Sequence, residues 1–305
     1  MNDVDYKKHS TQGALLIVVS SFFYGTYGVW SKLMVGTFGE FTQAWTRALL
    51  LLAILVPVGL LTRSFKPIQT SDYGWFIMIC LAGGLNQAPY FFGFKHLPIG
   101  TAMILFYALL TISMYGLGKL FFNEQLTAIK YVALGLALVG LTIIYRFNLS
   151  PQQLIPALCT MGAGVMGSIA VVFSKKISNR YSEVHILTTI LGAMLVSNLV
   201  ISLWLGEHFP ALGLTVPWFS QLGYSLAMLC ANLAVIAGFK LIEPSVGGIL
   251  GLLEVIFGVL LGILFFHEVM NWQMALGCLL IIVAAGASDS LNLLKKLTGQ
   301  LRLGR

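Results

Sequence analysis

Ten apolar stretches, each near the length needed to cross a lipid bilayer, restrict the fold of this chain more than any other feature. They lie at about 13–35, 41–61, 73–95, 98–121 and 128–146, and then at about 154–174, 184–205, 218–240, 245–266 and 271–291. A helix of about 20 apolar residues spans the hydrocarbon core. The stretches lack the alternating pattern of a membrane barrel. We therefore predict an all-α integral membrane protein with ten transmembrane helices.

The composition agrees with a membrane environment. Charged residues make up 10% of the 305 residues, apolar residues 58%, and the mean hydropathy is +0.88. These values lie far from those of soluble globular domains and indicate a lipid bilayer as the surroundings. The formal net charge of +7 does not indicate nucleic acid, because the basic residues lie in short connections rather than on one face.

The positions of the basic residues predict the orientation. If the N-terminus is cytoplasmic, fourteen of the 18 Lys and Arg residues fall on the inner side: Lys7, Lys8, Arg63, Lys66, Lys119, Lys130, Lys175, Lys176, Arg180, Lys240, Lys295, Lys296, Arg302 and Arg305. This positive-inside bias predicts a multi-pass protein of the cell inner (plasma) membrane with cytoplasmic tails at 1–12 and 292–305. The first apolar stretch is longer than that of a cleavable signal peptide, so we expect it to be retained.

The chain contains an internal repeat at an offset near 144 residues. The offset places "WSK" at Trp30–Lys32 over "FSK" at Phe173–Lys175, and "GKLFFNE" ending at Glu124 over "GILFFHE" ending at Glu268. We predict two homologous five-helix repeats at 13–146 and 154–291. Because five is odd, the second repeat must insert upside down relative to the first. Inverted repeats of this kind are typical of transporters that work by alternating access.

At these residues the chain resembles the drug/metabolite transporter superfamily, in the branch with two EamA-type five-helix modules. The resemblance runs from about Gly13 to Asp289, and its marks are "FFNE", "FFHE", Arg47 and "LLEV" at Leu252–Val255. The family usually has proline where Thr111 and Val255 stand in this chain. The resemblance implies a secondary carrier for small metabolites, often amino acids or their analogues, and commonly outward transport.

One carboxylate lies near the middle of a predicted span, and that is Glu254 in the ninth. It shares a helical stripe with four glycines, Gly247, Gly251, Gly258 and Gly262, so we expect it to face protein or cavity rather than lipid. Ionisable groups at membrane depth are costly and therefore functional candidates. Glu254 would meet a cationic group of the substrate, or take up and release a proton during transport. The alternative is a protonated Glu that bonds a neighbouring helix.

Polar and aromatic side chains at helical spacing extend this candidate site. We predict the substrate-binding residues Tyr24, Tyr27, Trp30, Asn86, Gln87, Tyr90, Tyr107, Ser168, Asn232 and Glu254. The repeat offset pairs Gln87 with Asn232, and it places Ser168 opposite Gly25. Amides supply donors and acceptors without a full charge, and tyrosines offer a ring and a hydroxyl. The alternative is that the amides simply hold the bundle together. We expect Arg47 to extend toward the outer surface as a structural anchor, or to link to a helix end, rather than to contact substrate.

Other classes of protein fit less well. No Asp lies in mid-span, the five His residues lie at or outside span ends, and the four cysteines are scattered without metal-ligand spacing. We therefore expect no enzyme activity, no metal and no cofactor. A G-x-x-x-x-G-K-[ST] loop for ATP is absent from the sequence. A non-transporting sensor or scaffold remains the alternative from another class.

The sequence thus predicts a secondary transporter that exports amino acids or similar amphipathic metabolites or drugs by alternating access. A proton-coupled or exchange-type importer of a cationic nucleoside-like metabolite fits the same residues. The substrate, the direction of transport and the coupling ion are left open, as is a homodimer.

Overall fold

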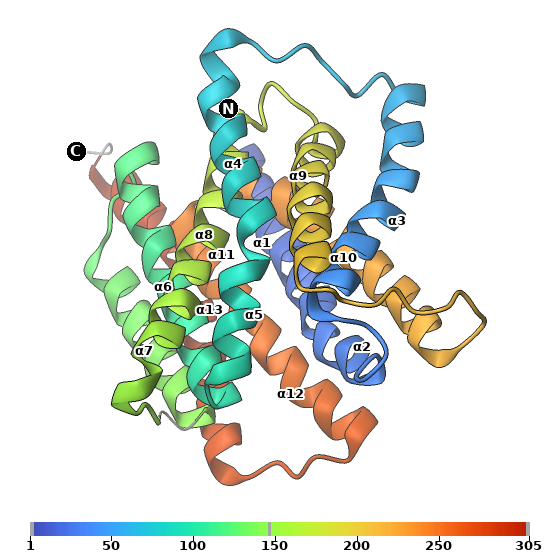
Figure 1. The fold of residues 1–305 in the computed structure, drawn as a ribbon. Coiled ribbons are helices and arrows are strands. Elements are labelled where there is room, and N and C mark those ends of the chain that lie inside the picture. Colours follow the sequence, from blue (N-terminus) through green and yellow to red (C-terminus); the bar gives the residue numbers. More distant parts are fainter. Residues whose placement is uncertain (1–2, 146–147, 303–305) are drawn as a thin grey trace.

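The computed structural model describes residues 3–145 and 148–302, and this part of the chain is helical without strands. The helices are α1 (Asp3–Gly25), α2 (Tyr27–Leu33), α3 (Glu40–Leu61), α4 (Tyr73–Leu85), α5 (Gln87–His96), α6 (Ile99–Phe122), α7 (Ala128–Ile144), α8 (Leu154–Ile177), α9 (Glu183–Trp204), α10 (Val216–Leu241), α11 (Pro244–Gly251), α12 (Leu253–Phe266) and α13 (Trp272–Arg302). Figure 1 shows them as one bundle.

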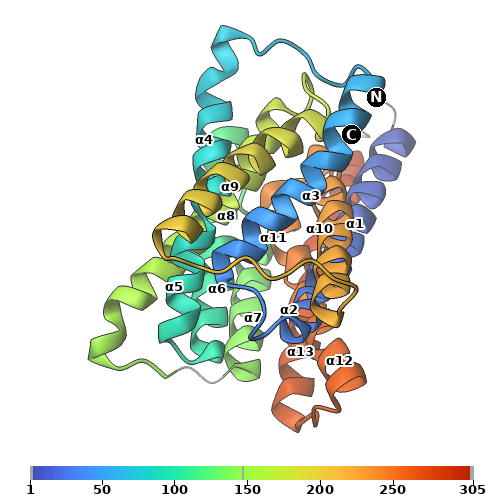
Figure 2. The same cartoon turned by 45° about the vertical axis from the view of Figure 1, so that its right-hand side comes forward.

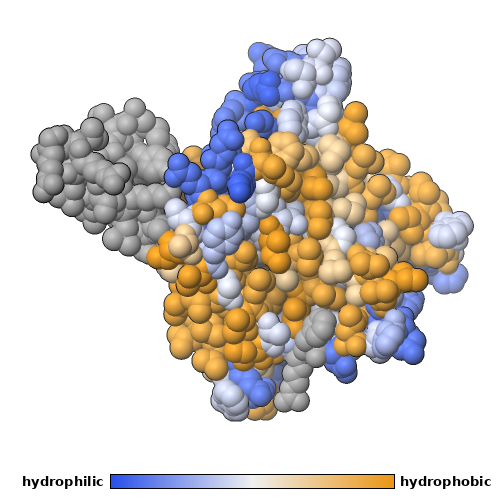
Figure 3. Space-filling view, turned by 90° about the vertical axis from the view of Figure 1, so that its left-hand side faces the viewer, coloured by the Kyte–Doolittle hydropathy of each residue, from blue (hydrophilic) through white to orange (hydrophobic). Residues whose placement is uncertain are grey.

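The predicted all-α membrane fold is confirmed. Among the described residues, 8 helical stretches are long and apolar enough to cross a membrane, and two shorter apolar helices, Ala128–Ile144 and Trp272–Ala287, stand at the fifth and tenth predicted spans. Apolar side chains cover a broad belt between more hydrophilic ends (Figure 3). The first and last helices of the chain are longer than predicted. Helix α1 begins at Asp3 and α13 continues to Arg302, within the segments that we assigned to the tails.

The start of α1 and the end of α13 lie at the same end of the bundle, which is the upper end in Figures 1 and 2. The connections from α3 to α4 and from α8 to α9 lie at this end too. We call it the terminal end. The connection from α12 to α13 lies at the opposite end.

Three of the ten spans are interrupted near their middle. The first breaks at Thr26 between α1 and α2, the third at Asn86 between α4 and α5, and the ninth at Leu252 between α11 and α12. Gly25 and Gly251 directly precede the first and last of these breaks, and glycine is a poor helix former. Pro89 lies in the first turn of α5, where a proline is tolerated. The ninth span is therefore broken without the proline that the family usually has at Val255.

The two repeats contact each other in matching ways. The second span α3 packs on the seventh, α9, and the fifth span α7 packs on the tenth, α13. The first span (α1) packs on the eighth (α10), and the third (α4 and α5) packs on the sixth (α8). These two contacts are equivalent, because the sixth and eighth spans are the counterparts of the first and third in the second repeat. These contacts support the two-repeat architecture.

Glycines allow a close approach between the repeats at α7 and α13. A Cβ atom at Gly140 of α7 would lie 2.7 Å from the carbonyl oxygen of Gly277 in α13, and a Cβ at Gly277 would lie 2.6 Å from that of Gly140. Small residues at helix interfaces in membranes let backbones pack closely. Because backbone atoms stand in the way, a larger residue must push the two helices apart.

We predict that Gly140→Ala destabilises the protein by about 1 to 3 kcal/mol because it overpacks this contact. Gly135→Ala, on the same helix, has open space around its added methyl group and is the matched control. Thermal unfolding of the detergent-purified variants measures the difference. Equal stability of the two variants would show that the α7–α13 contact is looser than described.

Candidate substrate-binding site

The helix breaks gather the predicted site residues around the middle of the bundle. Tyr24 and Tyr27 flank the break at Thr26, and Glu254 follows the break at Leu252. The first and ninth spans touch there: a Cβ at Gly25 would lie 2.6 Å from Cβ of Phe257 and 3.1 Å from the carbonyl oxygen of Glu254. Interrupted helices expose backbone groups at mid-membrane only where protein or a cavity surrounds them.

Glu254 points into the bundle. Its Oε1 accepts a hydrogen bond of 2.7 Å from the hydroxyl of Tyr107, which links α12 to α6. Its carbonyl oxygen lies beside Gly25, next to Tyr24 of α1. Glu254 is nevertheless partly exposed. A bonded but partly exposed carboxyl group is compatible with substrate contact as well as with a structural bond between helices.

A first aromatic group joins α1, α2 and α10. The ring centroids of Tyr24 and Tyr27 are 5.3 Å apart, and those of Tyr27 and Tyr224 are 4.3 Å apart. The Tyr24 hydroxyl donates to Oδ1 of Asn232 at 3.3 Å. Sequence reasoning missed Tyr224, although it lies eight residues before Asn232 and thus on the same face of α10.

Arg47 completes this group, and our expectation of an outer-surface anchor was wrong. The residue is 3% exposed, and its guanidinium carbon lies 3.9 Å from the centroid of the Tyr224 ring. Its Nη1 donates to Oε1 of Gln43 at 3.1 Å. An aromatic face attracts a guanidinium inside the bundle, which explains why Arg47 does not snorkel. Tyr27 lies within the electrostatic range of both Arg47 and Glu254.

A second aromatic group lies on α5 and α6. Tyr90 stacks on Phe94 at 4.2 Å between centroids and meets the edge of Phe106 at 5.2 Å. Phe106 in turn lies 5.2 Å from Tyr107, the partner of Glu254. The second group therefore reaches the carboxyl group of Glu254 through Tyr107.

The remaining predicted residues mostly make helix contacts. Nδ2 of Asn86 donates to the carbonyl oxygen of Ala163 at 3.2 Å, which ties the third span to α8. The Trp30 indole donates to Thr26 Oγ1 at 3.1 Å across the first break. Ser168 is fully buried and bonds Val165 O within its own helix. Gln87 is a partly exposed residue at the start of α5, and Asn232, which we paired with it, bonds Tyr24 and Met228.

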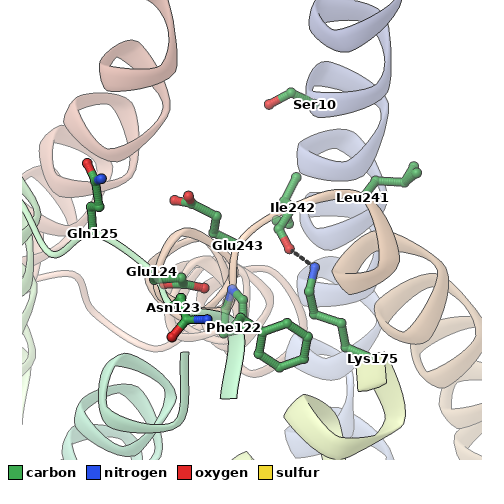
Figure 4. Close-up of a pocket in the computed structure, with 10 residues that line it drawn as sticks. Ser10, Phe122, Asn123, Glu124, Gln125, Lys175, Leu241, Ile242 and Glu243 are labelled. Carbon is green, nitrogen blue, oxygen red and sulfur yellow. Dashed lines mark hydrogen bonds between the residues drawn. The ribbon is translucent and has the colours of Figure 1, made fainter. Parts of the chain in front are cut away.

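A separate polar cavity of about 350 Å³ lies at the terminal end (Figure 4). It is lined by Ser10, Phe122, Asn123, Glu124, Gln125, Lys175, Leu241, Ile242, Glu243 and Pro244. Nζ of Lys130 lies 2.5 Å from Glu243 Oε2 and 3.8 Å from Glu124 Oε2. Burial raises the pKa of the Glu124 carboxyl group, and Ser245 and Lys130 oppose this shift.

The sequence model of the EamA-like transporter family matches residues 11–146 and 154–287. The chain belongs to this family. EamA-like proteins are membrane transporters of small molecules, and the two matched segments coincide with the two five-helix repeats. The fold also matches 29 chains of solved structures. One of them, described as "Crystal structure of protein", aligns with 92% of this EamA-like chain and with 97% of its own length, at a TM-score of 0.79 and 15% sequence identity. That likeness concerns the fold alone. No curated protein matches the sequence.

The hydrogen bond between Tyr107 and Glu254 is predicted to stabilise this EamA-like fold. In a double-mutant cycle of Tyr107→Phe and Glu254→Leu, we expect a coupling free energy of about 1 to 3 kcal/mol, because the bond lies in a region of low dielectric. Denaturant unfolding in detergent measures it. The exposed Tyr131 supplies the control cycle, Tyr131→Phe with Glu254→Leu, for which we expect additivity. Additive effects for Tyr107 as well would mean that the bond contributes nothing.

Proposed function

We propose that this EamA-like transporter exports amino acids or similar amphipathic metabolites across the inner membrane by alternating access between two oppositely oriented repeats. The observation that carries the proposal is that one acid and one base lie against the same group of tyrosines. Glu254 accepts a hydrogen bond from Tyr107, and its backbone lies against Gly25, next to Tyr24. Arg47 lies over the ring of Tyr224, which packs on Tyr27.

This arrangement fits the chemistry of a zwitterion. An ammonium group would bind the carboxylate of Glu254, and a carboxylate would bind the guanidinium of Arg47, whose Nε has no hydrogen-bond partner among the described residues. The aromatic groups around Tyr27 and Tyr90 would accept a flat or apolar side chain. In a low-dielectric site the two protein charges would offset the two charges of the substrate.

The contacts between the repeats support alternating access. The first span with the eighth and the third with the sixth are the same contact with the repeats exchanged. Two repeats that make matching contacts have two conformations available, in which each repeat adopts the arrangement of the other. With five spans in each repeat, such an exchange turns the site from one side of the membrane to the other.

The importer of a cationic nucleoside-like metabolite is the second candidate. Glu254 and the tyrosines also suit a flat cation. The buried Arg47 disfavours it, because its charge would repel a cation that carries no carboxylate. A sensor or scaffold would show ligand binding without turnover.

Counterflow in proteoliposomes separates these functions. We expect vesicles preloaded with an unlabelled amino acid to accumulate the labelled one, and we expect the corresponding amine, which lacks the carboxylate, to exchange more slowly. Faster exchange of a nucleoside-like cation would favour the importer. Absence of counterflow with every member of the panel would favour the sensor or scaffold.

Arg47→Gln tests the assignment of the carboxylate. We predict that KM for the amino acid rises about tenfold, because a charge-assisted contact of about 1.4 kcal/mol is lost, whereas KM for the amine does not rise. The matched control is Arg180→Gln, which removes an Arg paired with Asp72 outside this site. A parallel rise for both substrates would mean that Arg47 only supports the fold.

Glu254→Gln tests the acid. We predict a loss of amino acid counterflow of about tenfold or more, with the pH dependence of the remaining transport abolished if the carboxyl group also carries the coupled proton. Glu183→Gln, which changes an ion pair with Lys240 at the bundle end, is the control. An unchanged rate and pH profile would remove Glu254 from the mechanism.

A further inference from the structure

The "FFNE" and "FFHE" motifs end two helices in the same backbone conformation. Asn123 after α6 and His267 after α12 are both left-handed, with φ of 52° and 53°. The Glu124 amide donates to Gly118 O at 3.3 Å, and the Glu268 amide donates to Gly262 O at 3.4 Å. Each bond spans six residues, and in both helices the left-handed residue after the last turn is not the glycine that is usual at such a C-cap. The two glutamates therefore leave their helices in the same direction.

Both carboxyl groups fold back against a glycine. A Cβ at Gly118 would lie 2.7 Å from the Glu124 carboxyl carbon, and a Cβ at Gly262 would lie 2.5 Å from Glu268 Oε2. A methyl group at either position would displace the carboxylate. The repeat has thus kept the same device at opposite ends of the bundle.

The surroundings of the two glutamates differ. Oε2 of Glu124 accepts a bond of 3.3 Å from the Ser245 amide at the start of α11, and its side chain and that of Lys130 are 2% and 3% exposed. Glu268 instead pairs with Lys32 at 3.3 Å, where the side chains are 48% and 53% exposed. Both carboxylates reach the other repeat, but Glu124 is enclosed and Glu268 is exposed.

The lysines of the repeated "WSK" and "FSK" segments also differ in their surroundings. Lys175 lies at the terminal end, where its Nζ donates to the carbonyl oxygens of Phe239 and Ile242 at 2.6 Å each. Figure 4 shows the bond to Ile242. These bonds hold α8 to the end of α10. Its repeat equivalent, Lys32, lies over the Phe266 ring at 3.9 Å and binds the exposed Glu268.

We propose that Glu124 and Glu268 are equivalent gate residues that close opposite ends of the transporter in turn. Glu124 closes the terminal end by capping α11 of the other repeat and pairing with Lys130. When the repeats exchange conformations, Glu268 moves to the start of α6, the helix equivalent to α11 and α12, and Glu124 is released. Both act as positioning residues, and the proposal rests on the alternating access proposed above.

Thiol accessibility without any substrate tests the gate. Thr111 of α6 is fully buried, and a Cβ at Gly248 of α11 would lie 3.6 Å from the Thr111 Cγ2 atom. Thr111 therefore lies at the contact between α6 and α11, behind the proposed gate. A Thr111→Cys reporter is placed in a protein whose four native cysteines are replaced. A membrane-impermeant maleimide is then applied from the terminal end in vesicles of known orientation.

We expect Glu124→Ala to raise the labelling rate of Thr111→Cys about tenfold, because the open state gains population when the enclosed contacts are lost. Gly118→Ala should raise it too, since it displaces the carboxylate and leaves the charge in place. Glu268→Ala should not raise it, because Glu268 lies at the opposite end, where it pairs with Lys32 and does not close the terminal end. Glu183→Gln is the surface control. A reporter at the exposed Ser71→Cys, in the α3–α4 connection at the terminal end and outside the cavity, should label at one rate in every variant.

Labelling of Thr111→Cys that stays unchanged in both Glu124→Ala and Gly118→Ala, while Ser71→Cys labels at the same rate in every variant, would overturn the gate. An equal rise with Glu268→Ala would overturn it as well. Counterflow by the same preparations tests transport separately. If labelling changes as expected but no preparation shows counterflow, the gate proposal is supported and the proposed transport function is refuted.

Discussion

The structure depends on the rule that a backbone in lipid must satisfy its own hydrogen bonds. A broken helix is tolerated only where other helices or a cavity surround the break, so interruptions gather in the interior. Here the breaks at Thr26 and Leu252 fall on two spans that pack on each other, and the break at Asn86 falls on a span that packs on α8 and α9. Each break is a single residue that keeps right-handed helical dihedral angles, so the span continues through it.

Close packing holds this arrangement in register. Gly25 lets the first span touch the backbone of the ninth beside Glu254, and Gly140 and Gly277 let the two repeats touch at α7 and α13. Between lipid-exposed helices there is little hydrophobic driving force, so such contacts and interhelical hydrogen bonds provide much of the cohesion. The bond from Tyr107 to Glu254 serves both purposes, because it joins two helices and orients the acid.

Periodicity and composition were enough to predict the ten helices, the repeat and the candidate role of Glu254. These features follow from local rules: apolar length, helical stripes and the cost of charge in lipid. The sequence did not predict the burial of Arg47 or the part played by Tyr224, because their contact joins α3 to α10 across 177 residues of chain. It also did not predict a break at Leu252, where glycine and tertiary packing take the place of a proline.

Because the chain contains two repeats, equivalent residues can be compared within one structure. Glu124 and Glu268 have the same cap, and each carboxylate folds back against an equivalent glycine, yet one is enclosed and the other is exposed. Part of the difference lies in the sequence, because Met274 stands at the position equivalent to Lys130. The rest lies in the relative placement of the surrounding helices, which changes when two repeats exchange conformations. In the proposed cycle, the enclosed copy of the motif marks the end of the bundle that is closed.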